Sequence, residues 1–153
     1  MIIFLYIASA RFWAISALRA PHTDFNDLIK KIDQVIKPDD KIFASTTYWF
    51  GLSDHDYLSA QFYCRFSKRP DLKEKFGENF KEFIKKNKIN IIIVDSSFKA
   101  KMHASPESYI YFESPIDVAE FINKYTKEEL RVFNSDYSSK IIRSPIIVYR
   151  VKN

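Results

Sequence analysis

Glycine and cysteine are nearly absent from this sequence of 153 residues. Its two glycines are Gly51 and Gly77, which excludes glycine-rich phosphate loops and argues against propellers and barrels built on many tight turns. Cys64 is its single cysteine, so the chain has no internal disulfide and no thiolate metal cage. The G-x-S-x-G motif that exposes a nucleophilic serine is also missing. These absences predict a domain without a cofactor and without a catalytic motif of these kinds.

Long runs of one charge sign are also lacking. The net charge is +5, but lysines alternate with acidic residues in stretches such as 73–78 and 81–88. Mixed charge is typical of solvated helix faces, whereas nucleic-acid-binding domains more often have a clustered Arg/Lys stripe with interleaved aromatics. We therefore expect no nucleic-acid partner. Hydrophobic residues make up 46% of the chain, which predicts a folded domain rather than a disordered tail.

Residues 1–20 form a hydrophobic segment that is short for a full membrane span, which needs about 20 apolar residues. Positions 1–10 are almost wholly apolar, and Arg11 and Arg19 then flank a second apolar stretch. No positive region precedes them, as a signal peptide would require. One interpretation is a helix that packs on a domain formed by 22–153. The preferred one is the end of a transmembrane or membrane-interface helix, because the first ten residues have no polar face.

Strand and helix patterns alternate over residues 22–153 and predict a single α/β domain. Apolar residues at helical spacing predict helices that start near residues 24, 53, 71 and 114. Four strands are predicted, at 41–45, 89–95, 130–133 and 146–151. The sum is a small Rossmann-like three-layer domain of about four strands, with a parallel core and an antiparallel C-terminal pair, preceded by a hydrophobic N-terminal helix.

A candidate ligand site follows from this strand order. If the strands at 41–45 and 89–95 run parallel, their carboxyl ends share the edge at which open α/β sheets bind ligands. That edge would collect these candidate residues: Thr46, Thr47, Tyr48, Trp49, Asp95, Ser96 and Ser97. Aromatic faces beside hydroxyls and a carboxylate would suit a sugar. The simpler interpretation is a packed aromatic corner in which Trp49 and Phe50 are core residues.

The sequence Asp54-His55-Asp56 looks at first like a metal or acid–base cluster. However, Ser53 with Asp56 three residues later is a capping-box pattern, and carboxylates are favoured in the first turn of a helix. The spacing matches no zinc or calcium scheme. We therefore expect a helix cap here rather than a metal site. For the chain as a whole, we expect no metal site and no catalytic residue.

Four stretches that follow the hydrophobic segment and the first predicted helix carry a resemblance to a known family. They are IKPDDKI at 36–42, YWF at 48–50, KINIIIVD at 88–95 and VYRV at 148–151. This order resembles the C-terminal extracytoplasmic domain of polytopic membrane glycosyltransferases with the C-type fold, the dolichyl-phosphate-mannose–protein mannosyltransferase-like enzymes. The similarity covers nearly the whole chain as a pattern of elements rather than a diagnostic motif.

The resemblance implies a role at a membrane, outside the cytoplasm. Enzymes of this family take a sugar from a polyprenyl-phosphate donor, and their catalytic carboxylate lies in an early loop between transmembrane helices, so no catalytic residue is carried over to this chain. The expected function is a non-catalytic domain that caps the membrane site or helps to place the glycan acceptor. The alternative is a free-standing α/β binding or interaction module without enzymatic activity.

Overall fold

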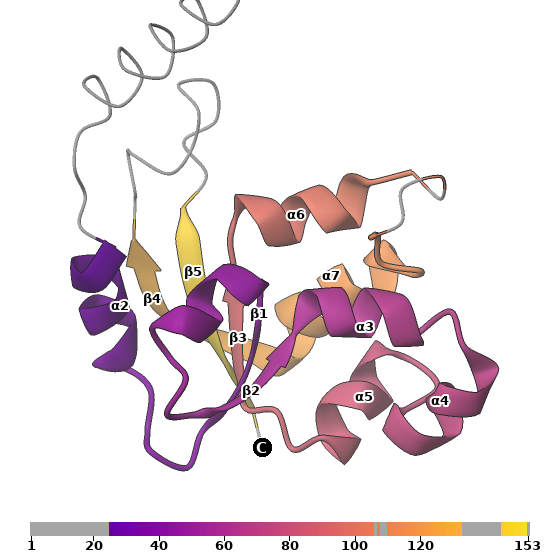
Figure 1. The fold of residues 1–153 in the computed structure, drawn as a ribbon, viewed down its shortest axis with the longest axis horizontal. Helices are drawn as coiled ribbons and strands as arrows, with labels where there is room; N and C mark the ends of the chain where they lie inside the picture. The colour runs from indigo at the N-terminus through magenta and orange to yellow at the C-terminus, as the bar shows by residue number, and fades with distance from the viewer. Residues whose placement is uncertain (1–24, 106, 108–109, 133–144, 153) are drawn as a thin grey trace, which may run out of the picture.

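The computed structural model describes residues 25–105, 107, 110–132 and 145–152. Its elements in chain order are α2 (Phe25–Asp33), β1 (Lys41–Ala44), the 3₁₀ helix η1 (Thr46–Phe50), β2 (Asp56–Ser59), α3 (Ala60–Phe66), α4 (Pro70–Phe76), α5 (Phe80–Lys86), β3 (Ile91–Val94), α6 (Ser96–His103), α7 (Pro115–Tyr125), β4 (Thr126–Val132) and β5 (Ile146–Val151). The strands form one mixed, open sheet in the order β2-β1-β3-β5-β4 (Figure 1). The prediction of an α/β domain is therefore confirmed.

Both predicted strand pairings are present in this sheet. β1 runs parallel to β3 as predicted, and it is also parallel to β2 on its other side. β5 is antiparallel to β4 and to β3. The described sheet has five strands rather than about four, because Asp56–Ser59 pairs with Lys41–Ala44 as an additional edge strand.

The helix predicted to start at Ser53 is wrong. The chain turns there, continues into β2, and enters α3 only at Ala60. The residue that caps α3 is Ser59, whose Oγ accepts the backbone N–H of Phe62 at 3.1 Å. Asp56 instead begins β2 and lies beside Lys41 of the neighbouring strand, with 3.6 Å between carboxylate and ammonium. Pairing with β1 therefore overrides the local capping-box pattern.

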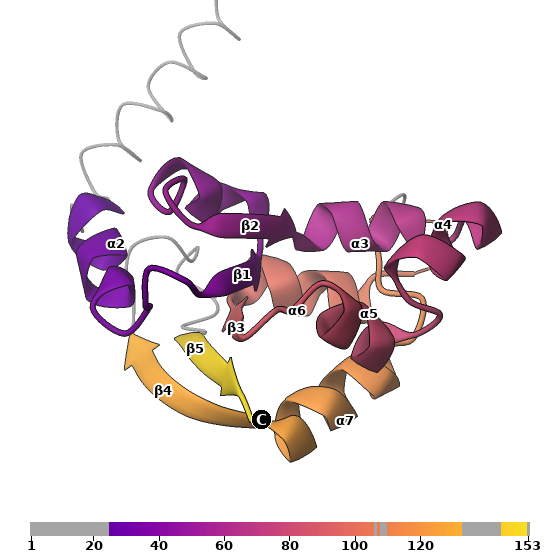
Figure 2. The same cartoon turned by 90° about the horizontal axis from the view of Figure 1, so that it is seen from below.

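Side chains alternate across the central strands and divide the core into two halves. On one face, Phe43 and Ile92 pack with residues of α3, α5, α6 and α7. On the other face, Ile42 and Ile91 pack with residues of α2 and η1. Figure 2 shows α2 on one side of the sheet and the larger group of helices on the other. The helices thus cover both faces in three layers, and β3 is buried on both sides as its apolar run predicts.

Phe43 of β1 lies at the centre of an aromatic cluster. The rings of Tyr63, Phe80, Phe83 and Phe98 surround it at centroid distances of 5.4 to 6.1 Å, three of them edge-on. Edge-to-face pairs of this kind are favourable beyond the area that they bury. The cluster joins α3, α5 and α6 to β1 and so holds the strand from which η1 extends.

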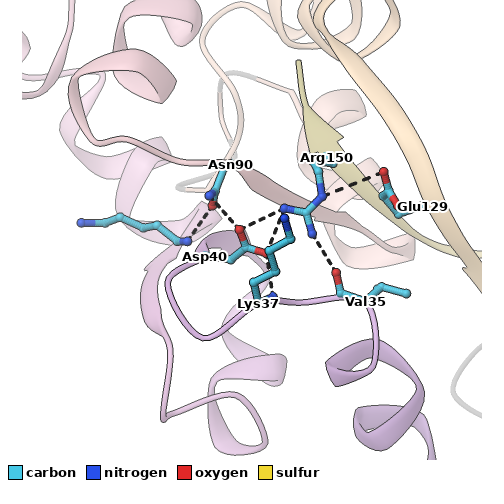
Figure 3. Close-up of polar contacts among 7 residues, drawn as sticks. Val35, Lys37, Asp40, Asn90, Glu129 and Arg150 are labelled. Carbon is cyan, nitrogen blue, oxygen red and sulfur yellow. Dashed lines mark hydrogen bonds and ion pairs between the residues drawn. The ribbon is translucent and has the colours of Figure 1, made fainter. Parts of the chain in front are cut away.

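A buried polar network joins the starts of β1 and β3 to the end of β5 (Figure 3). The Asp40 carboxylate, whose residue is 2% exposed, accepts hydrogen bonds from Arg150 Nη1 at 3.0 Å and from Asn90 Nδ2 at 2.8 Å. It also accepts the backbone N–H of Lys37 at 2.8 Å, and Arg150 Nη2 donates to the Val35 carbonyl at 2.8 Å. A buried charge needs such partners, and here they connect three strands.

The hydrophobic segment at 1–20 lies outside the described residues, as does the connection at 134–144. The N-terminal helix therefore stays a prediction. Within the described ranges, no helix is long and apolar enough to cross a membrane.

Candidate functional site

The carboxyl ends of β1, β2 and β3 meet at one edge of the sheet because the three strands are parallel. η1 follows β1, α3 follows β2, and α6 follows β3 (Figure 1). This edge therefore carries both predicted groups of candidate residues, 46–49 and 95–97. Their placement follows from strand pairing, as the sequence predicts.

Asp95 is a structural residue at this edge. It is buried, and its Oδ1 accepts the backbone N–H of Phe98 at 2.6 Å, which caps α6. The same oxygen accepts the hydroxyl of Ser45 at 3.0 Å. Since Ser45 follows β1 and Asp95 follows β3, this contact joins the ends of the two strands. The Asp95 carboxylate is thus directed into the fold rather than toward solvent.

Tyr57 of β2 also contacts Ser45 at this edge of the sheet. Its hydroxyl donates to the backbone carbonyl of Ser45. Burial, and then the negative charge of Asp95, raise the pKa of Tyr57 well above its ordinary value, so that the phenol stays a neutral donor. The capping-box pattern at Ser53 assigns Tyr57 to a helix, so the sequence does not predict this contact. Tyr57 packs on the α2 side of the sheet and Leu58 on the other side, but a strand of four residues is too short for this alternation to be recognised.

Lys101 is a second residue that sequence analysis misses. Its Nζ donates to the Ser97 hydroxyl at 2.8 Å and to the Ser97 carbonyl at 3.0 Å. The residue is only 7% exposed. Burial lowers the pKa of Lys101, against the smaller opposing effect of the nearby Asp95 carboxylate. The i,i+4 spacing of Ser97 and Lys101 on one helix is the sequence signal for their contact.

The three aromatic residues of η1 lie in different environments. Tyr48 is 3% exposed and belongs to the core on the α2 side of the sheet. Trp49 is 48% exposed and Phe50 is 75% exposed, with their rings edge-to-face at 5.5 Å. The interpretation of these two residues as core is therefore wrong. We refer to Trp49 and Phe50 as the exposed aromatic pair.

Tyr48 and Gly51 hold this pair in place. The backbone N–H of Gly51 donates to the Tyr48 carbonyl at 3.1 Å, which closes the 3₁₀ turn. A Cβ atom at position 51 would lie 2.5 Å from the side chain of Ile29 in α2, so η1 packs closely on that helix. The buried tyrosine and the tight contact at Gly51 fix a short element that presents two large rings to solvent.

Small hydroxyl residues lie at the same edge. Thr46, Thr47, Ser96 and Ser97 are all exposed. The backbone N–H of Thr46 donates to Gln61 Oε1 of α3 at 3.2 Å, which fastens the start of η1 to the neighbouring element. The edge thus combines aromatic surface with hydroxyl groups, while its carboxylate is buried.

Asp54, His55 and Asp56 do not converge on a common point. His55 Nε2 lies 3.1 Å from Asp33 Oδ1 of α2, and Asp56 lies beside Lys41. Over the ranges that the structure describes, no group of three or more His, Cys, Asp or Glu side chains is placed to hold a metal ion. His55 therefore links the loop before β2 to α2.

The predicted site residues fall into two groups. Tyr48 and Asp95 are fixed within the fold. The others, which have exposed side chains at the shared edge, are Thr46, Thr47, Trp49, Ser96 and Ser97. No protein-family model matches the chain, and comparisons with characterised proteins and with solved structures give no significant match.

Proposed function

We propose that this chain is a non-catalytic domain of a membrane glycosyltransferase that uses a polyprenyl-phosphate-linked sugar, and that it helps to place the glycan acceptor. The observation that carries the proposal is the exposed aromatic pair, Trp49 and Phe50, beside hydroxyl residues at the carboxyl edge of the parallel strands. Open α/β sheets bind ligands at this edge.

The chemistry of the edge supports a carbohydrate ligand. Exposed large apolar side chains that lie together commonly mark interaction surfaces. An aromatic face packs against the C–H face of a sugar ring, and the hydroxyls of Thr46, Thr47 and Ser96 offer donors and acceptors to sugar hydroxyls. Because the only described carboxylate at the centre of this edge, Asp95, caps α6, the geometry favours binding over acid–base chemistry.

The stretches that carry the family resemblance also support the proposal. Residues 36–42 lead into β1, residues 48–50 lie in η1, and residues 88–95 and 148–151 include β3 and much of β5. Asp40, Asn90 and Arg150 come from three of these stretches and share one hydrogen-bonded network. The parallel strands β2-β1-β3, with helices on both faces, are consistent with the small α/β domain that the alternation of strands and helices predicts.

We place the described domain on the outer side of a membrane, with the hydrophobic residues 1–20 as its attachment. This part of the proposal rests on the sequence of that segment and on the resemblance. Reading the genomic DNA upstream of Met1 tests it. An in-frame extension that encodes several hydrophobic spans and an acidic loop supports a glycosyltransferase, whereas a stop codon and ribosome-binding site at Met1 favour a free-standing binding module.

Trp49→Ala tests the sugar-binding surface directly. We expect saturation-transfer signals from mannotriose to fall at least tenfold in the variant, while the melting temperature changes little because Trp49 is about half exposed. Ile116→Ala is the matched control, since Ile116 is also a large exposed apolar residue but lies at the start of α7. If Trp49→Ala lowers the melting temperature and leaves the sugar signals unchanged, the aromatic pair is structural and the proposal fails.

A further inference from the structure

A groove of about 510 Å³ lies between α5, the end of α7 and the end of β5, away from the carboxyl edge of the parallel strands. Figure 2 shows α5 and α7 side by side, and the backbone N–H of Lys152, just after β5, donates to the Tyr125 carbonyl at the end of α7 at 2.8 Å. The groove is lined by residues of α5, of the connection to β3, of the end of α7 and of the end of β5. Its volume is in the range of small-molecule sites.

The floor of the groove is apolar. Ile84, Ile89 and Phe121 belong to the main core, and Val151 and Tyr125 pack against them. The polar side chain of Asn90 is already engaged, since it donates to Asp40 at 2.8 Å and accepts the Lys41 N–H at 2.7 Å. A ligand on this floor would therefore meet hydrocarbon and aromatic surface.

The rim of the groove is positively charged. Lys81, Lys85, Lys88 and Lys152 line it, and no acidic residue does. Glu82, the acid within this stretch of α5, turns back to accept the N–H of Glu78 at 3.0 Å. Thus the alternation of charge in the sequence does not persist around this groove, because Lys81 and Lys85 of α5 lie together with Lys88 and Lys152.

Two acidic residues lie close to one end of this rim, around Lys81. Asp117 and Glu120 line a separate groove of about 290 Å³ that shares Lys81, Phe121 and Tyr125 with the larger one. They reduce the positive potential near Lys81. The positive end of the larger groove is therefore defined by Lys85, Lys88 and Lys152.

Tyr125, which lines the groove, lies in a positively charged environment. Lys81 Nζ lies 4.7 Å from the centroid of its ring and 3.4 Å from its hydroxyl. Hydrogen bonds from Lys81 and Lys124, together with their charges, lower the pKa of Tyr125. The same environment would stabilise the charge of a bound anion.

Lys88 adopts a backbone conformation that is unusual for a residue with a side chain. Its φ is 55°, the left-handed region that favours glycine. The following N–H, from Ile89, donates to the Ile84 carbonyl at 3.0 Å and so terminates α5. Glycine or asparagine would fit this position better, yet the chain places a lysine at the rim. Strain of this kind often accompanies function.

We propose that this groove binds a single-chain anionic amphiphile, a fatty carboxylate or alkyl phosphate, with its chain across the partly exposed Tyr125 and Val151 and its head group among the lysine ammoniums. The charge complementarity of the rim and the apolar floor select this class over a neutral lipid or a sugar phosphate. The site is separate from the carboxyl edge and does not depend on the sugar-binding proposal.

The first probe is laurate below its micellar concentration, and its binding is detected by heteronuclear NMR of the purified chain. We expect shift changes at 81–90, 121–125 and 151–152, and binding at least tenfold weaker for neutral lauramide. Dodecyl phosphate should bind like laurate, whereas acetate should not bind at all. Equal affinity for laurate and lauramide, or shift changes confined to other regions, would overturn the proposal.

Lys88→Asn gives the sharpest variant because it separates binding from folding. Asparagine tolerates the left-handed conformation, so stability should stay the same or rise while laurate binding weakens severalfold. The triple variant Lys81→Gln, Lys85→Gln, Lys88→Asn should lose at least tenfold in affinity. In the control, Lys30, Lys37 and Lys127 are changed to Gln. This control has the same net charge as the triple variant, but it should bind laurate as tightly as the parent protein does. Equal losses in both triple variants would mean nonspecific attraction and refute the site.

Discussion

Replacing Arg150 with methionine should destabilise the fold strongly. The substitution removes two contacts at 3.0 Å to the Asp40 carboxylate and one at 2.8 Å to the Val35 carbonyl. Removal of one partner of a buried ion pair usually costs about 3–5 kcal/mol. Asp40 keeps hydrogen bonds from Lys37 and Asn90, so we expect a loss near the lower end, about 3 kcal/mol.

Urea denaturation followed by circular dichroism measures this loss, and Glu129→Gln is the control. Glu129 contacts the same guanidinium, but at 3.9 Å and with both side chains about a quarter exposed, so its loss should stay below about 1 kcal/mol. In a double-mutant cycle, adding Asp40→Asn to Arg150→Met should cost much less than Asp40→Asn alone. Equal destabilisation by Arg150→Met and Glu129→Gln would refute the role of the buried network.

Substitutions at three further positions test other parts of the structure. Gly77→Ala should cost about 2 kcal/mol or more in urea denaturation, because φ is +123° and the added Cβ would lie 2.5 Å from the backbone N of Phe83; an unchanged midpoint would contradict this. Asp95→Ala should cost about 2 kcal/mol, from a lost helix cap and an unpaired Ser45 hydroxyl, and Asp95→Asn should cost less. Burial raises the pKa of the Cys64 thiol to about 11, so iodoacetamide at pH 8 should modify it only as fast as the protein opens. The unfolded thiol ionises at about pH 8.5, so the raised pKa of the folded thiol stabilises the fold below that pH, and this contribution is lost as the pH rises toward 11. The Cys64→Ala variant, which has no thiol, should lose less stability than the parent between these two pH values. An identical loss in both proteins would exclude a contribution from the thiol.

The sequence predicts well the strands that are long apolar runs and the strand pairings that follow from the order of helices and strands. The unbroken run at 89–95 correctly indicates a strand buried on both faces, and the parallel pairing of β1 with β3 follows from the alternation of helices and strands. The antiparallel pair of β4 and β5 is also confirmed. These features depend on periodicity and burial, which a sequence displays directly.

Features that depend on tertiary packing, with no local pattern of their own, are missed. β2 has four residues and no strong strand pattern, so its pairing with β1 decides its conformation. Asp40 and Arg150 are 110 positions apart, and nothing local in either residue indicates that they meet. For the candidate site, strand order predicts the correct edge, but exposure of Trp49 and burial of Tyr48 depend on how η1 packs against α2.

Sugar binding at the exposed aromatic pair can be followed by an NMR titration of the ¹⁵N-labelled chain with mannotriose, in which the indole N–H of Trp49 gives a signal besides the backbone amides. We expect concentration-dependent shifts at the Trp49 indole and at backbone amides of 46–50 and 96–97, and none at the groove between α5 and the end of α7. A titration that leaves these signals unmoved while the protein remains folded, or that moves only signals on other faces, would contradict sugar binding at the exposed aromatic pair.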